Sequence, residues 1–145
     1  MSLLTREQFN AFVERAPDND YLAVKICFMV GASGCLRRKE LWRLENQDVT
    51  DNGHQLILEI PRTKWNYPRR FIISDDWYLK TKEYMILRPA NNHHDYFMLK
   101  YAKGRCSRSR MSSEEIRMTP KVIAEYLELA EPQNYLRFNI SNFWE

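Results

Sequence analysis

The sequence is short of the features that mark disulfide-rich, metal-binding and membrane proteins. Its cysteines are odd in number, and no pair has metal-ligand spacing, which argues against a disulfide framework and against a zinc site. The three histidines have no cysteine or acidic partners at ligand spacing, so we expect no metal and no cofactor. The residues concerned are Cys27, Cys35, Cys106, His54, His93 and His94.

Long apolar stretches are also missing. The longest run covers residues 26–32, whereas a membrane-spanning helix needs about 20 apolar residues. The first residues contain no signal-peptide core. Free cysteines fit a reducing compartment, and we expect a nuclear protein that has no membrane partner.

What remains is a chain of ordinary globular composition. Its 145 residues suffice for one domain with a real core. Hydrophobic residues make up 44% and aromatic residues 13%, which argues against disorder over most of the length. The net charge of +3 is a mild basic bias that permits a nucleic-acid partner without requiring one.

The hydrophobic pattern predicts an α+β fold: a mainly helical domain with a small antiparallel β-sheet. A turn at 51–53 and apolar runs on either side predict up to three strands between residues 49 and 74. Residues 96–101 read as a strand or an extended segment. Helices are expected over residues 6–16, 21–30, 36–44, 77–87 and from 120 onward.

Polar residues at the expected helix starts give the boundaries. Thr5 and Gln8 have the spacing of a capping box for the first helix. Asp20 is expected to cap the second helix, and Asp75 or Asp76 the fourth. Thr119 is expected to cap the last helix, with Pro120 at its first position.

One motif carries chemical information. The stretch Gly34-Cys-Leu-Arg-Arg-Lys-Glu-Leu-Trp-Arg-Leu places Arg37 at the entrance of a helix, with Glu40 three residues on. It resembles the first signature of the tyrosine recombinases, the phage-integrase-type enzymes, which is Gly-x-x-Arg-x-x-Glu-Leu-x-x-Leu. The hairpin that follows, with Arg62-Thr-Lys64 between its strands, matches that family as well. The resemblance implies that Arg37 and Lys64 are remnants of a phosphate-binding cluster and that Glu40 orients the arginine.

A later part resembles a narrower group. The segment Tyr96-Phe-Met-Leu-Lys-Tyr-x-x-Gly-Arg-Cys and the helix after Thr119 are similar to recombinase-like domains of animal transposable elements, of the Crypton and DIRS kind. The resemblance runs from about residue 3 to Tyr135, so we divide the chain into a recombinase-like domain, 1–135, and a divergent tail, 136–145.

The resemblance ends where the family's chemistry would continue. Related domains go on to a His-x-x-Arg motif and then a nucleophilic tyrosine, and neither is found at the corresponding place after Tyr135. An arginine and a lysine can stabilise phosphate charge, but they cannot form the covalent intermediate that strand transfer requires. We therefore expect a truncated catalytic fold without an intact catalytic residue, that is, a pseudoenzyme.

Basic residues supply a second argument. Between Lys100 and Arg110 the chain carries five cations and no acid. Such a segment is either a solvated loop or a contact for phosphate backbones. Likewise, Arg37 and Glu40 could be a plain surface pair, and Lys64 a solvated lysine. The expected DNA-binding residues are Arg37, Arg38, Lys64, Arg69, Arg70, Lys103, Arg105, Arg108 and Arg110.

The tail is more apolar than a free chain end should be. Phe138, Ile140, Phe143 and Trp144 lie within its ten residues. The tail could fold back over the domain, dock on a protein partner, or pair two copies of the chain.

Three functions follow in order. The first is non-catalytic binding of double-stranded DNA through the basic surface, without a small-molecule substrate. The second is a protein-interaction module on a truncated recombinase fold, without DNA binding. The third is one part of an active recombinase whose nucleophile is supplied elsewhere.

Overall fold

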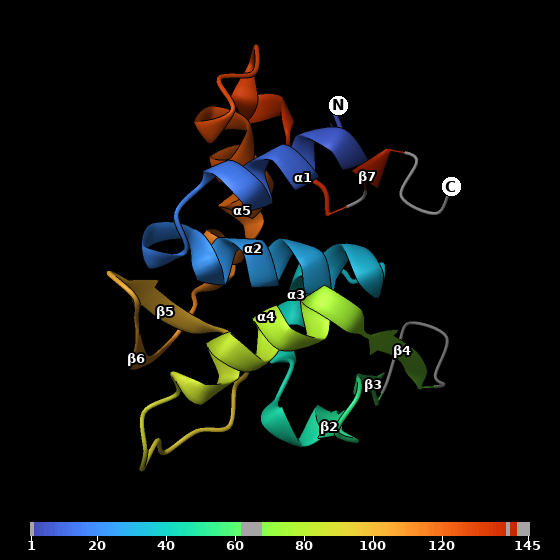
Figure 1. Cartoon of the computed structure of the whole chain (residues 1–145), viewed down its shortest axis with the longest axis vertical. Coiled ribbons are helices and arrows are strands. Elements are labelled where there is room, and N and C mark those ends of the chain that lie inside the picture. Colours follow the sequence, from blue (N-terminus) through green and yellow to red (C-terminus); the bar gives the residue numbers. More distant parts are fainter. Residues whose placement is uncertain (1, 62–67, 139, 142–145) are drawn as a thin grey trace.

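The computed structural model describes residues 2–61, 68–138 and 140–141. Helices α1 and α2 cross the upper and middle parts of the molecule, while α4, the hairpin β5–β6 and the sheet β2–β3–β4 lie below α2 (Figure 1). The helices are α1 (Arg6–Arg15), α2 (Asp18–Ser33), α3 (Arg38–Arg43), α4 (Asp75–Ile86) and α5 (Ser113–Tyr126). The strands are β1 (Leu4–Thr5), β2 (Val49–Asp51), β3 (Leu56–Ile60), β4 (Arg69–Ile73), β5 (Leu99–Ala102), β6 (Arg105–Arg110) and β7 (Ile140–Ser141). Two short 3-10 helices, η1 (Asn46–Asp48) and η2 (Pro132–Asn134), complete the described elements.

Helix α1 begins where the sequence predicted. The Thr5 hydroxyl accepts a hydrogen bond from the Gln8 N–H at 3.0 Å, and the Gln8 side chain accepts one from the Thr5 N–H at 2.9 Å. This reciprocal pair satisfies two of the four N–H groups that a helix start leaves without partners. The predicted capping box is confirmed.

Helix α2 is the central element, and ten of its sixteen residues are buried. A helix that is apolar nearly all round has to lie inside the protein. The prediction that Asp20 caps it is wrong, because the helix already begins at Asp18 after Pro17. Proline cannot continue the preceding helix, and its fixed φ suits a helix entrance, so the boundary falls at Pro17 instead.

The predicted antiparallel sheet is confirmed. Strand β3 lies between β2 and β4, with Val49 opposite Leu58 and Leu58 opposite Phe71. Alternate residues of β3 point into the core, since Leu56, Leu58 and Ile60 are buried. Helix α4 follows β4 directly and begins at Asp75 with Ser74 as its N-cap, so the prediction that Asp75 or Asp76 caps it is wrong by one or two residues.

Residues 99–110 form a second antiparallel unit rather than a loop. Strands β5 and β6 pair with each other, and Lys103 and Gly104 make the turn with φ of +52° and +77°. Two consecutive residues of positive φ suit the right-handed twist of a tight hairpin.

The prediction that Thr119 caps the last helix is wrong. Helix α5 begins at Ser113, with Ser112 as the N-cap and Glu115 completing a capping box. Pro120 lies inside the helix, and the Thr119 hydroxyl donates to the Glu115 carbonyl oxygen at 3.1 Å. Both residues are buried, so packing outweighs the local cost of an internal proline.

The described part of the tail folds back on the domain. Strand β7 pairs in parallel with β1, so the first and last described strands lie side by side. Phe138 is buried, and its ring centroid lies 5.8 Å from that of Phe28. Gly31 makes room for this ring, because a Cβ there would come within 2.6 Å of Phe138 Cδ1. Phe143 and Trp144 lie outside the described residues, and the division at residue 135 stays a prediction.

Among the residues that the structure describes, no helix is long and apolar enough to span a membrane. Within the same residues, no three or more His, Cys, Asp or Glu side chains gather where they could hold a metal ion.

Candidate nucleic-acid interface

Arg37 stands at the entrance of α3, as the motif predicted. Its backbone is extended, with φ −83° and ψ 157°, and the helix begins at the next residue. Glu40 in the first turn accepts a hydrogen bond from the Arg37 N–H at 2.9 Å. The carboxylate therefore fixes the backbone of Arg37, while the guanidinium is exposed and forms no ion pair with any acid in the described chain.

The same carboxylate reaches the sheet. Glu40 Oε1 accepts a second hydrogen bond from Arg69 Nη2 at 2.6 Å, which joins α3 to β4. Only 16% of the Glu40 side chain is exposed, against 35% for Arg69. Arg69 Nε is buried without a hydrogen-bond partner in the described structure, which leaves a donor of this guanidinium unsatisfied. Arg37 and Arg69, expected in one surface, are thus brought together by Glu40.

Arg70, the next residue of β4, lies on the opposite face of the sheet from Arg69. It lies opposite Glu59 in the register of β3 and β4, and its Nη2 is 3.0 Å from Glu59 Oε2. Both side chains are largely exposed, so this pair contributes little to stability. Arg38 is exposed at the first position of α3, and its charge helps to lower the pKa of Glu114, after the larger effect of the Arg117 hydrogen bond. Lys64, the expected phosphate-binding lysine, lies outside the described residues.

The hairpin β5–β6 presents the remaining expected cations, and it is irregular. Leu99 pairs with Arg110 and Tyr101 with Cys106, so the single residue Lys100 faces the three residues 107–109. We call residues 107–109 the β6 bulge. A bulge takes residues out of the ladder and directs their side chains outward, and all three residues here are exposed.

The β6 bulge is held by His94. Its Nδ1 accepts a hydrogen bond from the Tyr96 N–H at 3.2 Å, so Nε2 carries the proton and donates to the Arg108 carbonyl oxygen at 2.7 Å. Arg88 in turn donates to the carbonyl oxygens of His94 and Tyr96, at 2.8 and 2.7 Å. The loop before β5 therefore fixes the backbone of Arg108 while its side chain stays exposed.

Arg110 has a different role from its neighbours. Its guanidinium carbon lies 3.3 Å from the ring centroid of Tyr96 and 3.7 Å from that of Trp42, between two rings that are nearly parallel. It also donates to the Trp42 carbonyl oxygen. A cation between two aromatic faces is stabilised by both ring quadrupoles, so Arg110 fastens β6 to α3.

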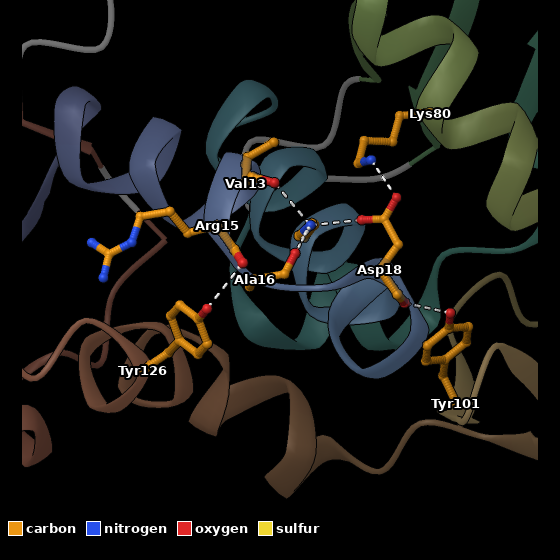
Figure 2. A network of polar contacts seen from close by, with 8 residues as sticks. Val13, Arg15, Ala16, Asp18, Lys80, Tyr101 and Tyr126 are labelled. Atoms are coloured by element: carbon orange, nitrogen blue, oxygen red, sulfur yellow. Dashed lines mark hydrogen bonds and ion pairs between the residues drawn. The ribbon is translucent and has the colours of Figure 1, made fainter.

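Lys25 and Asp18 form a network that the sequence reading missed (Figure 2). Lys25 is 1% exposed, and its ammonium donates to the carbonyl oxygens of Val13 and Ala16 and to Asp18, at 2.9, 2.6 and 2.6 Å. It satisfies carbonyls at the end of α1 and pairs with an acid at the start of α2. A lysine inside an apolar helical run was the signal that could have revealed it.

Asp18 also connects this network to the hairpin. The Tyr101 hydroxyl of β5 donates to the Asp18 carbonyl oxygen at 2.6 Å, and Lys80 of α4 donates to its carboxylate at 2.6 Å (Figure 2). Burial raises the pKa of Asp18, but the hydrogen bonds from Lys25 and Lys80 outweigh burial and hold that pKa below 3.8. The Gly104 N–H donates to the Asn19 carbonyl oxygen at 2.8 Å, so the turn is anchored as well.

The expected cations thus divide by their contacts. Arg69, Arg70 and Arg110 are held by Glu40, Glu59 and two aromatic rings. Five exposed side chains of this set form no ion pair with any acid among the residues that the structure places: Arg37, Arg38, Lys103, Arg105 and Arg108. Helix α3 connects strand β4 to strand β6, because Glu40 accepts from Arg69 and the Trp42 carbonyl accepts from Arg110.

The comparisons with known proteins bear on the fold. The structure is similar to that of XerA recombinase, with a TM-score of 0.70 and 17% identity over 91% of this chain. It is also similar to XerH site-specific recombinase bound to its palindromic difH substrate in a post-cleavage complex, with a TM-score of 0.65 and 16% identity over 94% of this chain. The chain has the fold of the part of the Xer recombinases that it matches. It spans 45% of the XerA chain and 39% of the XerH chain, so less than half of each solved protein is matched.

Sequence-based comparison finds nothing of this kind: no family model matches the chain, and neither does a curated protein. The likeness to recombinases therefore rests on the structure and on the motif around Arg37.

Proposed function

We propose that this chain binds double-stranded DNA through the phosphate backbone and does not cut it. The observation that carries the proposal is a set of exposed cations that form no ion pair within the described residues: Arg37 at the entrance of α3, with Lys103, Arg105 and Arg108 on the hairpin. Such side chains bind phosphates because each contact releases condensed counterions from the duplex. The recombinase fold supports the proposal, since XerH was solved bound to its difH substrate.

The absence of cleavage by the chain itself follows from its chemistry. Glu40 is hydrogen-bonded to Arg37 and Arg69, and these three residues supply positive charge for a phosphate but include no tyrosine that could act as the nucleophile. Strand transfer requires a nucleophile that is activated and placed against the phosphorus. Descent from a transposable element of the Crypton or DIRS kind and a nuclear location belong to the same proposal.

The test is a gel-shift titration with long duplexes of unrelated sequence at several salt concentrations. We expect affinity to fall with salt, with a log–log slope of about −0.9 per phosphate contact, and therefore near −4 for four contacts. The triple variant Lys103→Ala/Arg105→Ala/Arg108→Ala should flatten that slope by two to three units and weaken all sequences alike.

A matched control removes the same charge elsewhere. The triple variant Arg15→Ala/Lys121→Ala/Arg137→Ala takes three cations from α1, α5 and the C-terminal segment, and it should leave the slope unchanged. If both triple variants flattened the salt dependence equally, net charge alone would drive DNA binding. The absence of salt-sensitive binding at low ionic strength would overturn the DNA proposal.

A groove favours the second function, protein interaction. Helices α2 and α5 enclose about 290 Å³ beside β5, with Ala23, Val24, Met118 and Val122 among its apolar lining. Flexible methionine side chains suit the binding of apolar partner segments. If the wild-type chain does not bind DNA duplexes, substitutions in this groove are the first test of protein interaction.

A further inference from the structure

Two serines lie among the cations of β6. Residues 105–110 read Arg-Cys-Ser-Arg-Ser-Arg, and both Ser107 and Ser109 are exposed. The Ser107 hydroxyl accepts a hydrogen bond from the Ser109 N–H at 3.1 Å, within the β6 bulge. The Ser109 hydroxyl forms no side-chain hydrogen bond within the described structure. Ser109 therefore presents a hydroxyl without a hydrogen-bond partner in the described structure, and its neighbour in sequence, Arg108, is exposed.

The geometry makes this segment accessible to an enzyme. The ladder pairs of the hairpin lie on either side of the bulge, so residues 107–109 take no part in it. The unit has two strands, and the outer edge of β6 is not paired with another described strand. An extended edge segment can be bound by a second protein without unfolding of the hairpin.

We propose that Ser109 is a phosphorylation site, with Ser107 as a second acceptor, for a serine kinase that recognises arginine through acidic side chains. The exposed cations Arg105 and Arg108 attract such a surface. In the reaction the Ser109 Oγ attacks the γ-phosphorus of a magnesium-bound nucleoside triphosphate. The bond from that phosphorus to the bridging oxygen breaks, the diphosphate leaves, and the hydroxyl proton passes to a base of the kinase.

The regulatory consequence rests on the proposed DNA binding. A phosphoserine carries about −1.5 to −2 charges at neutral pH, so two add about −3 to −4. The exposed cations Lys103, Arg105 and Arg108 sum to +3, which two phosphates would cancel. Phosphate oxygens also bind guanidinium groups at close range, so Arg105 and Arg108 would be occupied within the protein and lost to DNA.

The site is tested by incubating the folded chain with magnesium, ATP and an arginine-directed serine kinase, followed by intact mass and peptide mapping. We expect one phosphate on Ser109 and then a second on Ser107. Ser109→Ala should abolish the first, whereas Ser113→Ala, next to the Ser112 cap, should change nothing. Arg108→Ala should slow incorporation several-fold if the cation is recognised.

Three results would overturn the site. The first is phosphate only at other serines, such as Ser112 or Ser113. The second is no incorporation while a peptide of residues 103–112 is fully modified, which would mean that the fold closes the site. The third is equal modification by an acid-directed kinase, because arginine would then not be what is recognised.

Measuring duplex binding before and after phosphorylation tests the regulation separately from the proposed DNA binding. If the unmodified chain binds duplexes, the doubly phosphorylated protein should bind at least tenfold more weakly at low salt, with a slope flatter by two to three units. Unchanged binding would overturn the regulation. If the unmodified chain binds no duplex, the DNA proposal fails, and the mass measurement alone still decides the site.

Discussion

Glu40 and Arg69 form an ion pair of 2.6 Å between the first turn of α3 and the start of β4. The same oxygen caps the N–H of Arg37. One carboxylate therefore sets the distance between two of the cations that the proposed interface uses, and it does so from a largely buried position. An exposed pair could not do this, because solvent and side-chain freedom would loosen it.

Replacing this carboxylate should weaken the link. Glu40→Gln retains an acceptor for the Arg37 N–H but loses the charge opposite Arg69. We expect the free energy of unfolding to fall by about 1 kcal/mol in urea denaturation, as for a partly buried charge-assisted hydrogen bond. The matched control Glu59→Gln breaks the exposed pair with Arg70 and should cost less than about 0.5 kcal/mol. If both variants lost the same free energy of unfolding, the burial of Glu40 would not strengthen its ion pair.

Arg108 and Arg110 should separate into a binding and a structural role. Arg110→Ala removes a cation that lies between Trp42 and Tyr96, so we expect a loss of stability of about 2 kcal/mol and a change in tryptophan fluorescence. Arg108→Ala should alter stability by less than about 0.5 kcal/mol, since its side chain is exposed.

Duplex binding supplies the second readout for this pair. Arg108→Ala should flatten the salt dependence by about one unit. If Arg110→Ala left stability unchanged and flattened the slope as much as Arg108→Ala, the two arginines would share a role and the assignment would be wrong.

Features that depend on residues close together in the sequence were predicted correctly. The capping box of Thr5 and Gln8 was predicted correctly, because a cap depends on neighbours three residues apart. The position of Arg37 at the entrance of α3 was predicted from the resemblance to the recombinase signature, although the helix begins at Arg38 and not at about residue 36. The three-stranded sheet followed from the turn at 51–53 and the alternation of β3.

Features set by tertiary contacts were not predicted. Pro120 reads as a helix start, yet burial of α5 against α2 places it inside a helix that Ser112 caps. The β6 bulge depends on His94, fourteen residues away in sequence from Arg108. Lys25 reads as an exception within an apolar run, and its partners, the Val13 and Ala16 carbonyls, lie on another helix and its cap. No local pattern encodes these contacts.

The Asp18 network should make stability sensitive to acid. The pKa of Asp18 in the folded protein lies below its ordinary 3.8, because the lysine hydrogen bonds outweigh burial. A lowered pKa stabilises the fold above the unfolded value, and that contribution disappears as the pH falls through the folded value. Asp18→Asn should therefore cost about 1 to 2 kcal/mol at pH 7, a reduced figure because 40% of Asp18 is exposed.

The pH dependence distinguishes this from a simple packing effect. The difference between wild type and Asp18→Asn should shrink as the pH falls below about 3.8, when the carboxyl becomes neutral in both states. The control Asp20→Asn removes a charge from the same helix turn, away from Lys25, and should cost less. A difference that stays constant down to acid pH would exclude the ion pairs as its cause.

Phe138 and Gly31 allow the folded-back tail to be tested by a double-mutant cycle. Phe138→Ala alone should cost about 3 kcal/mol, because it empties a buried aromatic site. Gly31→Ala alone should cost about 1 to 3 kcal/mol, since its Cβ would come within 2.6 Å of the Phe138 ring. In the Phe138→Ala background the same change should cost much less, because only the Cβ of residue 138, at 3.2 Å, stays close to the added methyl group and alanine is the better residue inside α2. Thermal and urea denaturation of the four proteins measure this difference in cost. If Gly31→Ala is equally harmful in both backgrounds, the tail does not occupy this position in solution.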